Sequence, residues 1–243
     1  MRNLFLVSDE QQLTDYKDFL ESNWPLLQDY LEYLQLYFQV EELPQAIIWT
    51  DEEAATRYIR ECPIPACTND VRMVMTPDLH VWKNIYLKQV ESYSVEDSQE
   101  IVEHYHSLST NFLLQIIGHE LAHQSECFLD YDVETMWFEE GMVEYISRRY
   151  FLTDEEYIRE KQINQQLVQL FQSKNGYHHL SQFGQATYDR DYASIFYEYW
   201  RSFLAIDLLV ESFGTVEDVF YSYHDWHDQG RPVDLLTWFQ LEI

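Results

Sequence analysis

The segment "LLQIIGHELAHQSE" (residues 113–126) constrains the fold more than any other part of the chain. Its leucines and isoleucines follow a helical repeat, which predicts a helix buried in the core. His119, Glu120 and His123 lie at the centre of that helix. Burying them without partners would cost on the order of several kcal/mol. The segment therefore predicts either two histidines hydrogen-bonded in the core beside a surface glutamate, or a bound metal ion.

The two histidines are four residues apart, which places them on one face of a helix, one turn from each other. With Glu120 they form the pattern H-E-x-x-H, in which two imidazoles bind zinc and the glutamate acts as a general base. A catalytic zinc ion also needs a third protein ligand and an open position for water. The pattern alone does not supply that third ligand.

The segment "MWFEEGMVEYIS" (136–147) contains candidates for the third ligand. Glu140 follows His123 by 17 residues, enough for a helix end, a turn and a second helix that packs back. Glu144 lies on the same helical face as Glu140. Glu139 is a rival ligand, although it is turned by about 100° from that face.

These two motifs together carry a resemblance to a known family. "HELAH" followed by "WFEEGMVEY" is similar to the gluzincins, the thermolysin-like zinc metallopeptidases, and most similar to their peptidase MA-like branch. The resemblance implies that His119, His123 and Glu140 bind one zinc ion and that Glu120 is the catalytic base. It also implies that Glu144 holds a ligand histidine through its second ring nitrogen, which would fix the tautomer of that ring.

The resemblance covers roughly residues 100–215 and extends to a later helix. The segment "DRDYASIFYEYWRSFLAIDLLVESFG" is similar to the helix that follows the zinc helices in this family. That likeness implies Tyr192 as a donor to the oxyanion, with Tyr197 and Tyr199 as rivals. It further implies that a strand such as "NIYLKQV" (84–90) forms the edge of the cleft, where an extended peptide could pair.

The expected function is that of an endopeptidase-like zinc metallopeptidase acting on a peptide or protein. Zinc would lower the pKa of its bound water, and Glu120 would take the proton as that water attacks the carbonyl. A regulatory protease, a hydrolase of non-peptide amides and a non-catalytic zinc-binding module remain alternatives. An aminopeptidase is disfavoured, because no G-x-M-E-N-type segment precedes the predicted zinc helix.

Two glycines lie inside the predicted zinc helices, although the whole chain has only six. Gly118 and Gly141 each cost about 1 kcal/mol relative to alanine in a helix interior. A close approach of the two ligand-bearing helices would justify that cost, whereas neutral tolerated glycines are the alternative.

Composition excludes several other functions. The 243 residues include 43 acidic and 15 basic side chains, giving a formal charge of −28. Such a chain is not expected to bind nucleic acid or an anionic membrane. Cys62, Cys67 and Cys127 are too few for a disulfide framework, and no signal segment or membrane span is evident, so we expect reduced thiols and a cytoplasmic protein.

The pattern of apolar residues predicts an α+β fold in a single zincin-like domain, residues 1–243. A small α/β part with a short mixed sheet (1–93) precedes a mostly helical part that carries the zinc site (94–243). Helical spacing over 9–40 is interrupted at "SNWP", where one helix should end and another begin. The remaining predicted helices are 51–60, 96–106, 109–127, 136–151, 154–173, 189–213, 216–227 and 232–241, and the predicted strands are 46–50, 71–75 and 81–90.

The other histidines are weaker candidates for metal binding. His224 and His227 are three residues apart and are expected on a polar helix face. His178 and His179 are expected in a loop, and His104 and His106 cannot share a helical face. Cys127 is expected to be a buried thiol.

Overall fold

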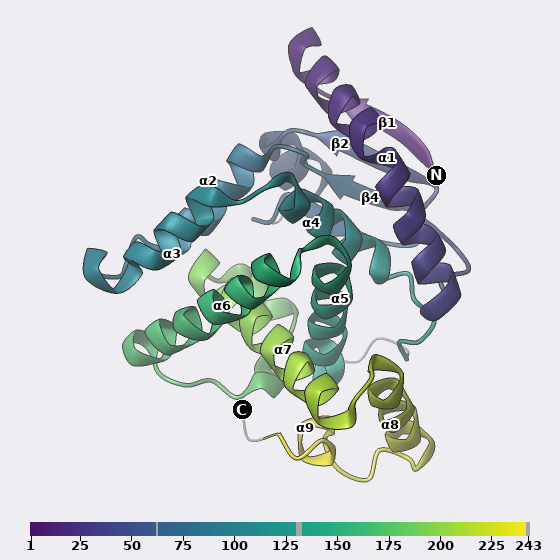
Figure 1. Cartoon of the computed structure of the whole chain (residues 1–243), viewed down its shortest axis with the longest axis vertical. Helices are drawn as coiled ribbons and strands as arrows, with labels where there is room; N and C mark the ends of the chain where they lie inside the picture. The colour runs from purple at the N-terminus through teal and green to yellow at the C-terminus, as the bar shows by residue number, and fades with distance from the viewer. Residues whose placement is uncertain (62, 130–132, 242–243) are drawn as a thin grey trace.

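The computed structural model describes residues 1–61, 63–129 and 133–241 (Figure 1). Strands occur only among the first 75 residues of these ranges, and helices dominate the remainder. This is the α+β arrangement expected from the sequence. The elements are β1 (Arg2–Leu6), α1 (Glu10–Tyr37), β2 (Ala46–Thr50), the π-helix η1 (Ala54–Ile59), β3 (Ala66–Thr68), β4 (Arg72–Met75), α2 (Leu79–Val90), α3 (Val95–Ser107), α4 (Thr110–Ala122), the 3₁₀ turn η2 (Val133–Thr135), α5 (Met136–Phe151), α6 (Asp154–Asn175), the 3₁₀ turns η3 (Leu180–Gln182) and η4 (Gln185–Asp189), α7 (Tyr192–Phe213), α8 (Val216–Asp228) and α9 (Leu235–Trp238).

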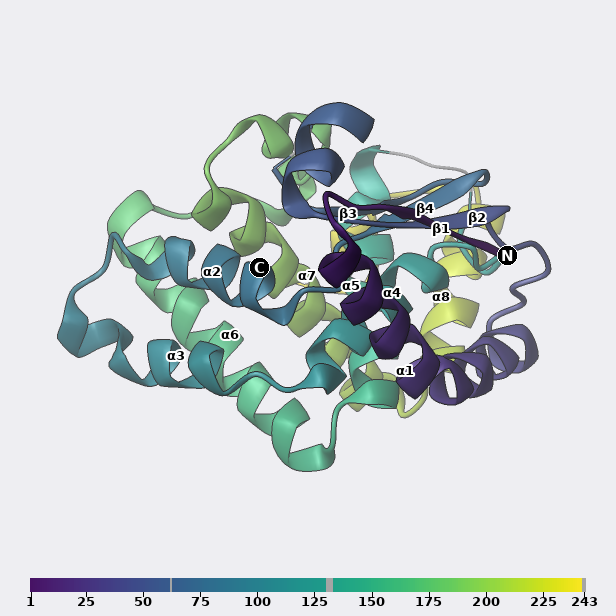
Figure 2. The ribbon, with the colours of Figure 1, turned by 90° about the horizontal axis from the view of Figure 1, so that it is seen from above.

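The four described strands form one sheet in the order β1-β2-β4-β3. β1, β2 and β4 are parallel, and β3 runs antiparallel to β4, so the expected short mixed sheet is confirmed. α1 and α4 lie on the same side of the sheet (Figure 2). α4 packs against β3 and β4, which brings the edge of the sheet close to the predicted metal-binding helix.

α1 is one continuous helix of 28 residues, so the predicted break at "SNWP" is wrong. Asp9 caps the helix by accepting a hydrogen bond from the backbone N–H of Gln12. Pro25 lies inside the helix and removes one backbone hydrogen bond. Burial of Tyr30 and Leu34 further along the helix offsets that loss.

α2 replaces the strand that was predicted over residues 81–90. Its buried side chains include Trp82, Ile85 and Gln89, which recur every three or four residues as a helix requires. Asp78 caps the helix by accepting from the backbone N–H of His80. The apparent alternation of apolar residues was therefore accidental.

The remaining differences concern short elements. β1 and β3 were not predicted: β1 is mostly exposed and shows no buried face, and β3 has only three residues. The predicted helix over 232–241 shrinks to the single turn α9. The predicted helix over 51–60 is the π-helix η1. Cys62, one of the three cysteines, lies outside the described residues.

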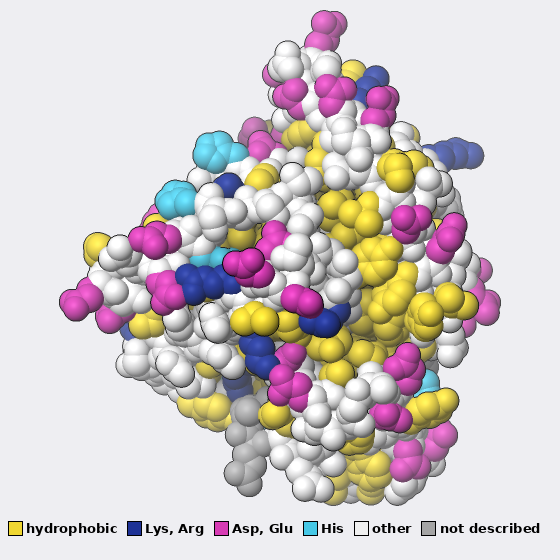
Figure 3. Space-filling model, viewed as in Figure 1, with side chains coloured by type: hydrophobic (Ala, Val, Ile, Leu, Met, Phe, Trp, Pro, Cys, Tyr) yellow, Lys and Arg dark blue, Asp and Glu magenta, His cyan; other side chains and the backbone are white. Residues whose placement is uncertain are grey.

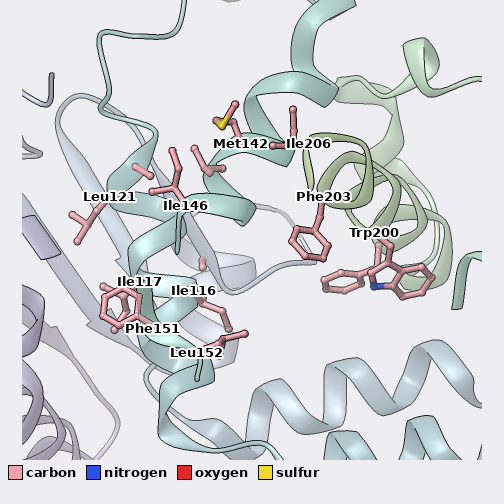
Figure 4. Close-up of a cluster of buried hydrophobic side chains, with 14 of the residues drawn as sticks. Ile116, Ile117, Leu121, Met142, Ile146, Phe151, Leu152, Trp200, Phe203 and Ile206 are labelled. Atoms are coloured by element: carbon pink, nitrogen blue, oxygen red, sulfur yellow. The ribbon is translucent and has the colours of Figure 1, made fainter. Parts of the chain in front are cut away.

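The core around α4 is built by three helices that cross one another. α5 packs against both α4 and α7. Side chains from the three helices interdigitate in Figure 4, among them Ile117 on α4, Ile146 on α5 and Phe203 on α7, and all three are at most 1% exposed. This packing fixes the two helices that carry the predicted ligands.

The surface carries many acidic groups. On the face shown in Figure 3 the aspartates and glutamates are spread over several elements, and a band of apolar side chains lies beside α1. Among the described residues, no helix combines the length and the apolar character needed to cross a membrane.

Candidate metal centre

The side chains predicted to hold a metal ion come together where α4 meets α5. Ser109 caps α4 by accepting from the backbone N–H of Asn111, and the helix then runs apolar to His119 and Glu120. His123 follows directly after the last residue of α4. His119 and Glu120 are less than 9% exposed.

α5 brings Glu140 against these two histidines. Oε2 of Glu140 lies 3.3 Å from Nε2 of His119 and 3.6 Å from Nε2 of His123. The two Nε2 atoms lie 3.2 Å from each other. Among the described residues, these three side chains form the one group of histidine, cysteine and carboxylate ligands with the spacing that a metal ion needs. Residues 17 to 21 positions apart in the sequence thus meet as predicted.

Both imidazole rings are oriented by carboxylates on their outer side. Nδ1 of His119 lies 3.0 Å from Oε1 of Glu144, and Nδ1 of His123 lies 2.8 Å from Oε1 of Glu139. A ring whose Nδ1 donates to a carboxylate presents the lone pair of Nε2 to a metal. Glu144 takes the position that the resemblance implied. Glu139, the rival ligand, instead contacts His123 from behind.

This donor set fits a small cation. If each Nδ1 donates to its carboxylate, two nitrogen lone pairs and a carboxylate oxygen point at one another. In that state no N–H is directed at the buried Oε2 of Glu140, which faces the two Nε2 atoms. A cation would satisfy all three atoms at once, whereas their mutual approach is otherwise repulsive.

Charge and burial shift the acidities of these groups. Burial lowers the pKa of His119, but its hydrogen bonds to Glu140 and Glu144 outweigh burial and raise that pKa to about 9. Burial opposes ionisation of Glu140 too, yet the facing His123 and His119 hold its pKa well below the usual range. Burial raises the pKa of Glu120. Protons therefore compete for the atoms that face the cation position.

A cavity of about 370 Å³ opens over these side chains. Glu120 is in its wall, as a base acting on water inside the cavity would have to be. β3 also lines the cavity, through Ala66, Cys67 and Thr68. The segment 84–90, which was expected to form the edge strand of the cleft, belongs to α2 instead. The described strand at the edge of the cavity is β3.

The tyrosine implied as oxyanion donor does not reach the cavity. The hydroxyl of Tyr192 donates to the backbone carbonyl of Pro63, at 3.1 Å. Tyr199 and Tyr188 line the cavity, and their hydroxyls lie 2.6 Å apart. The hydroxyl of Tyr188 also lies 3.4 Å from Oε1 of Glu140. The geometry thus favours Tyr199, one of the two rivals, and Tyr188.

The second rival, Tyr197, is directed away from the metal centre. Its hydroxyl accepts a hydrogen bond from Nε2 of Gln172 on α6, and its ring stacks on Phe171. Only one of the three tyrosines considered on α7 therefore faces the ligands.

Both glycines allow close packing, but only Gly118 does so against the other helix of the pair, as expected. A Cβ atom on Gly141 would lie 2.4 Å from the backbone carbonyl oxygen of Ser202, so this glycine admits α7 rather than α4. A Cβ atom on Gly118 would lie 2.5 Å from the ring of Phe151 at the end of α5 and 3.1 Å from the ring of Tyr30 on α1. Clearance between α4 and α5 therefore explains only part of the pattern.

Two of the remaining histidines, His104 and His224, have partners of their own. Nε2 of His104 contacts Glu160 at 2.6 Å, and Nε2 of His224 contacts the backbone carbonyl of Cys127 at 2.7 Å. His227 is exposed on α8. Cys127 is a buried thiol, as expected.

Sequence reasoning missed three side chains around the centre. Gln115 on α4 donates to Oγ of Ser147 at 3.1 Å and approaches Oε2 of Glu144 at 3.3 Å. Nε of Arg148 lies 2.7 Å from the same oxygen. Arg148 follows Glu144 by four residues, a spacing that could have indicated the pair. Tyr188 had no such signal, because it lies in the short turn η4.

Comparison with known proteins adds no further information on this centre. The chain matches no family model, no curated protein and no solved structure.

Proposed function

We propose that this protein is a zinc metallopeptidase with a thermolysin-like core. The observation that carries the proposal is the spacing of three ligand atoms. Four atoms placed tetrahedrally at about 2.1 Å from a zinc ion lie about 3.4 Å from one another. The separations among Nε2 of His119, Nε2 of His123 and Oε2 of Glu140 are 3.2, 3.3 and 3.6 Å.

The donor types support zinc over other ions. Two imidazoles and one carboxylate are typical of catalytic zinc, whereas calcium and magnesium prefer oxygen ligands. Three protein ligands leave a fourth position, and the cavity lies over them. Bound zinc would supply a Lewis acid that acidifies water and polarises a carbonyl group.

Glu120 is proposed as the general base. Its carboxylate is buried in the wall of the cavity, where burial raises its pKa. A carboxylate with a raised pKa accepts a proton more readily and can pass it to the leaving amine. Tyr188 and Tyr199 are proposed to donate hydrogen bonds to the developing oxyanion.

A peptide is the substrate class that the surroundings favour. β3 is at the end of the sheet and pairs only with β4 among the described strands, so one row of its backbone groups has no neighbouring strand. All three residues of β3, Ala66, Cys67 and Thr68, line the cavity. An extended peptide could bind there by adding a strand to the sheet.

Two measurements test the proposal. Elemental analysis of protein purified without a metal-affinity tag should find one equivalent of zinc in the wild type and almost none in His123→Ala. A peptide library should be cut by the wild type but not by Glu120→Gln, which keeps the zinc. Wild-type protein without zinc affinity would refute the metal site, and zinc-loaded protein inert on a broad library would refute the peptidase.

A further inference from the structure

A row of charged and polar side chains, largely buried, leads away from the candidate metal centre. It starts at Glu144 on α5, passes through Arg148 one turn later, and continues to Asn164 and Glu160 on α6 and His104 on α3. The row thus joins three helices behind His119.

Both carboxylate oxygens of Glu144 have a specific partner. Oε1 faces Nδ1 of His119 at 3.0 Å, and Oε2 lies 2.7 Å from Nε of Arg148. Gln115 adds a weaker contact to the same Oε2. A carboxylate held at both oxygens cannot rotate without breaking one of these contacts. The orientation of the His119 ring therefore depends on the position of Arg148.

Arg148 is itself held from the opposite side. Nη1 donates to Oδ1 of Asn164 at 3.1 Å, and Nη2 lies 3.8 Å from Oε1 of Glu160. Asn164 donates to that same oxygen at 2.9 Å. The guanidinium also lies over the ring of Phe203 on α7, with its central carbon 4.1 Å from the ring centroid.

The far end of the row is equally enclosed. Oε2 of Glu160 contacts His104, and Glu160 is only 3% exposed. Asn164 is fully buried and Arg148 is 6% exposed. α6 thus offers Arg148 a fixed anchor rather than a mobile surface charge.

Stability alone does not account for such a row. Removing charged groups from water is energetically costly, and apolar side chains of similar volume often stabilise a core as well or better. What the row provides is fixed geometry, because a planar guanidinium holds its partners in defined positions.

We infer that Arg148 is a positioning residue for the metal centre, acting on His119 through Glu144. Its anchor is the pair Asn164 and Glu160 on α6. The inference rests on the proposed function, because it assumes that His119 is a metal ligand. According to this inference, α6 contributes no ligand itself but helps to fix the orientation of the His119 ring.

Zinc affinity is the property that separates positioning from a structural role. Arg148→Lys keeps the charge but loses the planar fork, and Arg148→Met removes both. Outer partners of ligand histidines typically change metal affinity by about 10- to 100-fold. We expect Arg148→Lys to weaken zinc binding by about tenfold and Arg148→Met by more, measured by competition with a chromophoric chelator on folded protein.

Arg201→Met is the matched control. Arg201 is likewise a buried arginine, 4% exposed, that pairs with a glutamate on its own helix, Glu198 at 3.3 Å. Neither residue lines the cavity of the metal centre. This variant should lose stability but keep wild-type zinc affinity. Glu160→Gln, which loosens the anchor without removing Arg148, should weaken zinc binding severalfold and serves if Arg148→Met does not fold.

A spectroscopic readout completes the test. Cobalt bound in place of zinc should show altered visible absorption in Arg148→Lys and an unchanged spectrum in Arg201→Met. Unchanged zinc affinity and cobalt spectrum in Arg148→Lys would overturn this inference alone. Absence of metal binding in the wild type would overturn the proposed function and this inference with it.

Discussion

His119 and His123 face each other through Nε2 at 3.2 Å, while Glu144 and Glu139 contact their Nδ1 atoms from behind. Each ring is therefore oriented by its own glutamate on α5, so that the two Nε2 atoms point toward each other. Without a cation, at least one proton must occupy the space between the nitrogens and Glu140. Protons and a metal ion therefore compete for these three atoms.

Loss of the metal should make stability depend on pH in a defined window. Burial lowers the pKa of His119, but hydrogen bonds to Glu140 and Glu144 outweigh it and raise that pKa from the ordinary 6.5 to about 9 in the folded, metal-free chain. Because the folded pKa is the higher one, the stabilisation is complete below pH 6.5 and is lost as the pH rises through 9. Urea unfolding of chelator-treated protein should show falling stability across this window.

The zinc-loaded protein should lack this decline, because a bound ion replaces the proton. Calorimetry in buffers of different ionisation enthalpy should detect proton release on zinc binding at pH 7. His119→Gln is the control, and it should reduce both the decline and the proton release, leaving the part that His123 contributes. A decline of unchanged size in His119→Gln would assign it to groups other than His119.

Glu120→Gln should lower kcat by at least about 10²-fold while zinc content stays at the wild-type level. The amide keeps the shape of the side chain but cannot accept the proton from water. Activity on a peptide substrate and zinc content should be measured on the same preparation. Full activity in this variant would show that another group is the base.

Tyrosine variants can decide between the oxyanion donors that the structure favours and the one that the family resemblance implied. Tyr199→Phe and Tyr188→Phe should each lower kcat by about 10- to 100-fold with little change in KM, because the lost hydrogen bonds would form mainly in the transition state. Tyr192→Phe should leave kcat unchanged, because its hydroxyl is engaged with Pro63. The reverse result would mean that α7 changes position when substrate binds.

Alanine in place of the two helical glycines should reduce stability by different amounts, because one glycine packs against backbone and the other against side chains. Gly141→Ala sets a methyl group against the backbone of α7 at Ser202, which cannot move alone, and should destabilise the fold by about 3 kcal/mol. Gly118→Ala meets the rings of Phe151 and Tyr30, which can shift. It should cost about 1 kcal/mol in the same urea titration. Equal losses would contradict this distinction.

The grouping of His119, His123 and Glu140 could be predicted because much of their arrangement is local. A spacing of four places His119 and His123 on one face of any helix, and the same rule pairs Glu140 with Glu144. Which tyrosine lines the cavity is not decided locally. Tyr192 and Tyr199 are on the same helix, and which of them faces the ligands depends on how α7 sits against α5.

The errors in secondary structure have a similar origin. Trp82, Ile85 and Gln89 identify α2 as a helix only once the buried face is known. In the sequence alone, apolar and polar side chains over residues 81–90 also alternate as they would in a strand. α1 passes through Pro25 because the packing of its apolar face outweighs a local breaking signal. Both outcomes were decided by contacts with distant parts of the chain.

The placement of the ligands along the chain has a consequence for the order of folding. The three candidate ligands occupy positions 119 to 140, so bringing them together closes a short loop at small entropic cost. The cavity wall at β3 and the hydroxyl of Tyr30, which donates to the carbonyl of Gly118 at 3.0 Å, come from much earlier in the sequence. A metal ion captured by the α4–α5 pair would therefore act as a cross-link in the unfinished chain, favouring the route on which the sheet docks last.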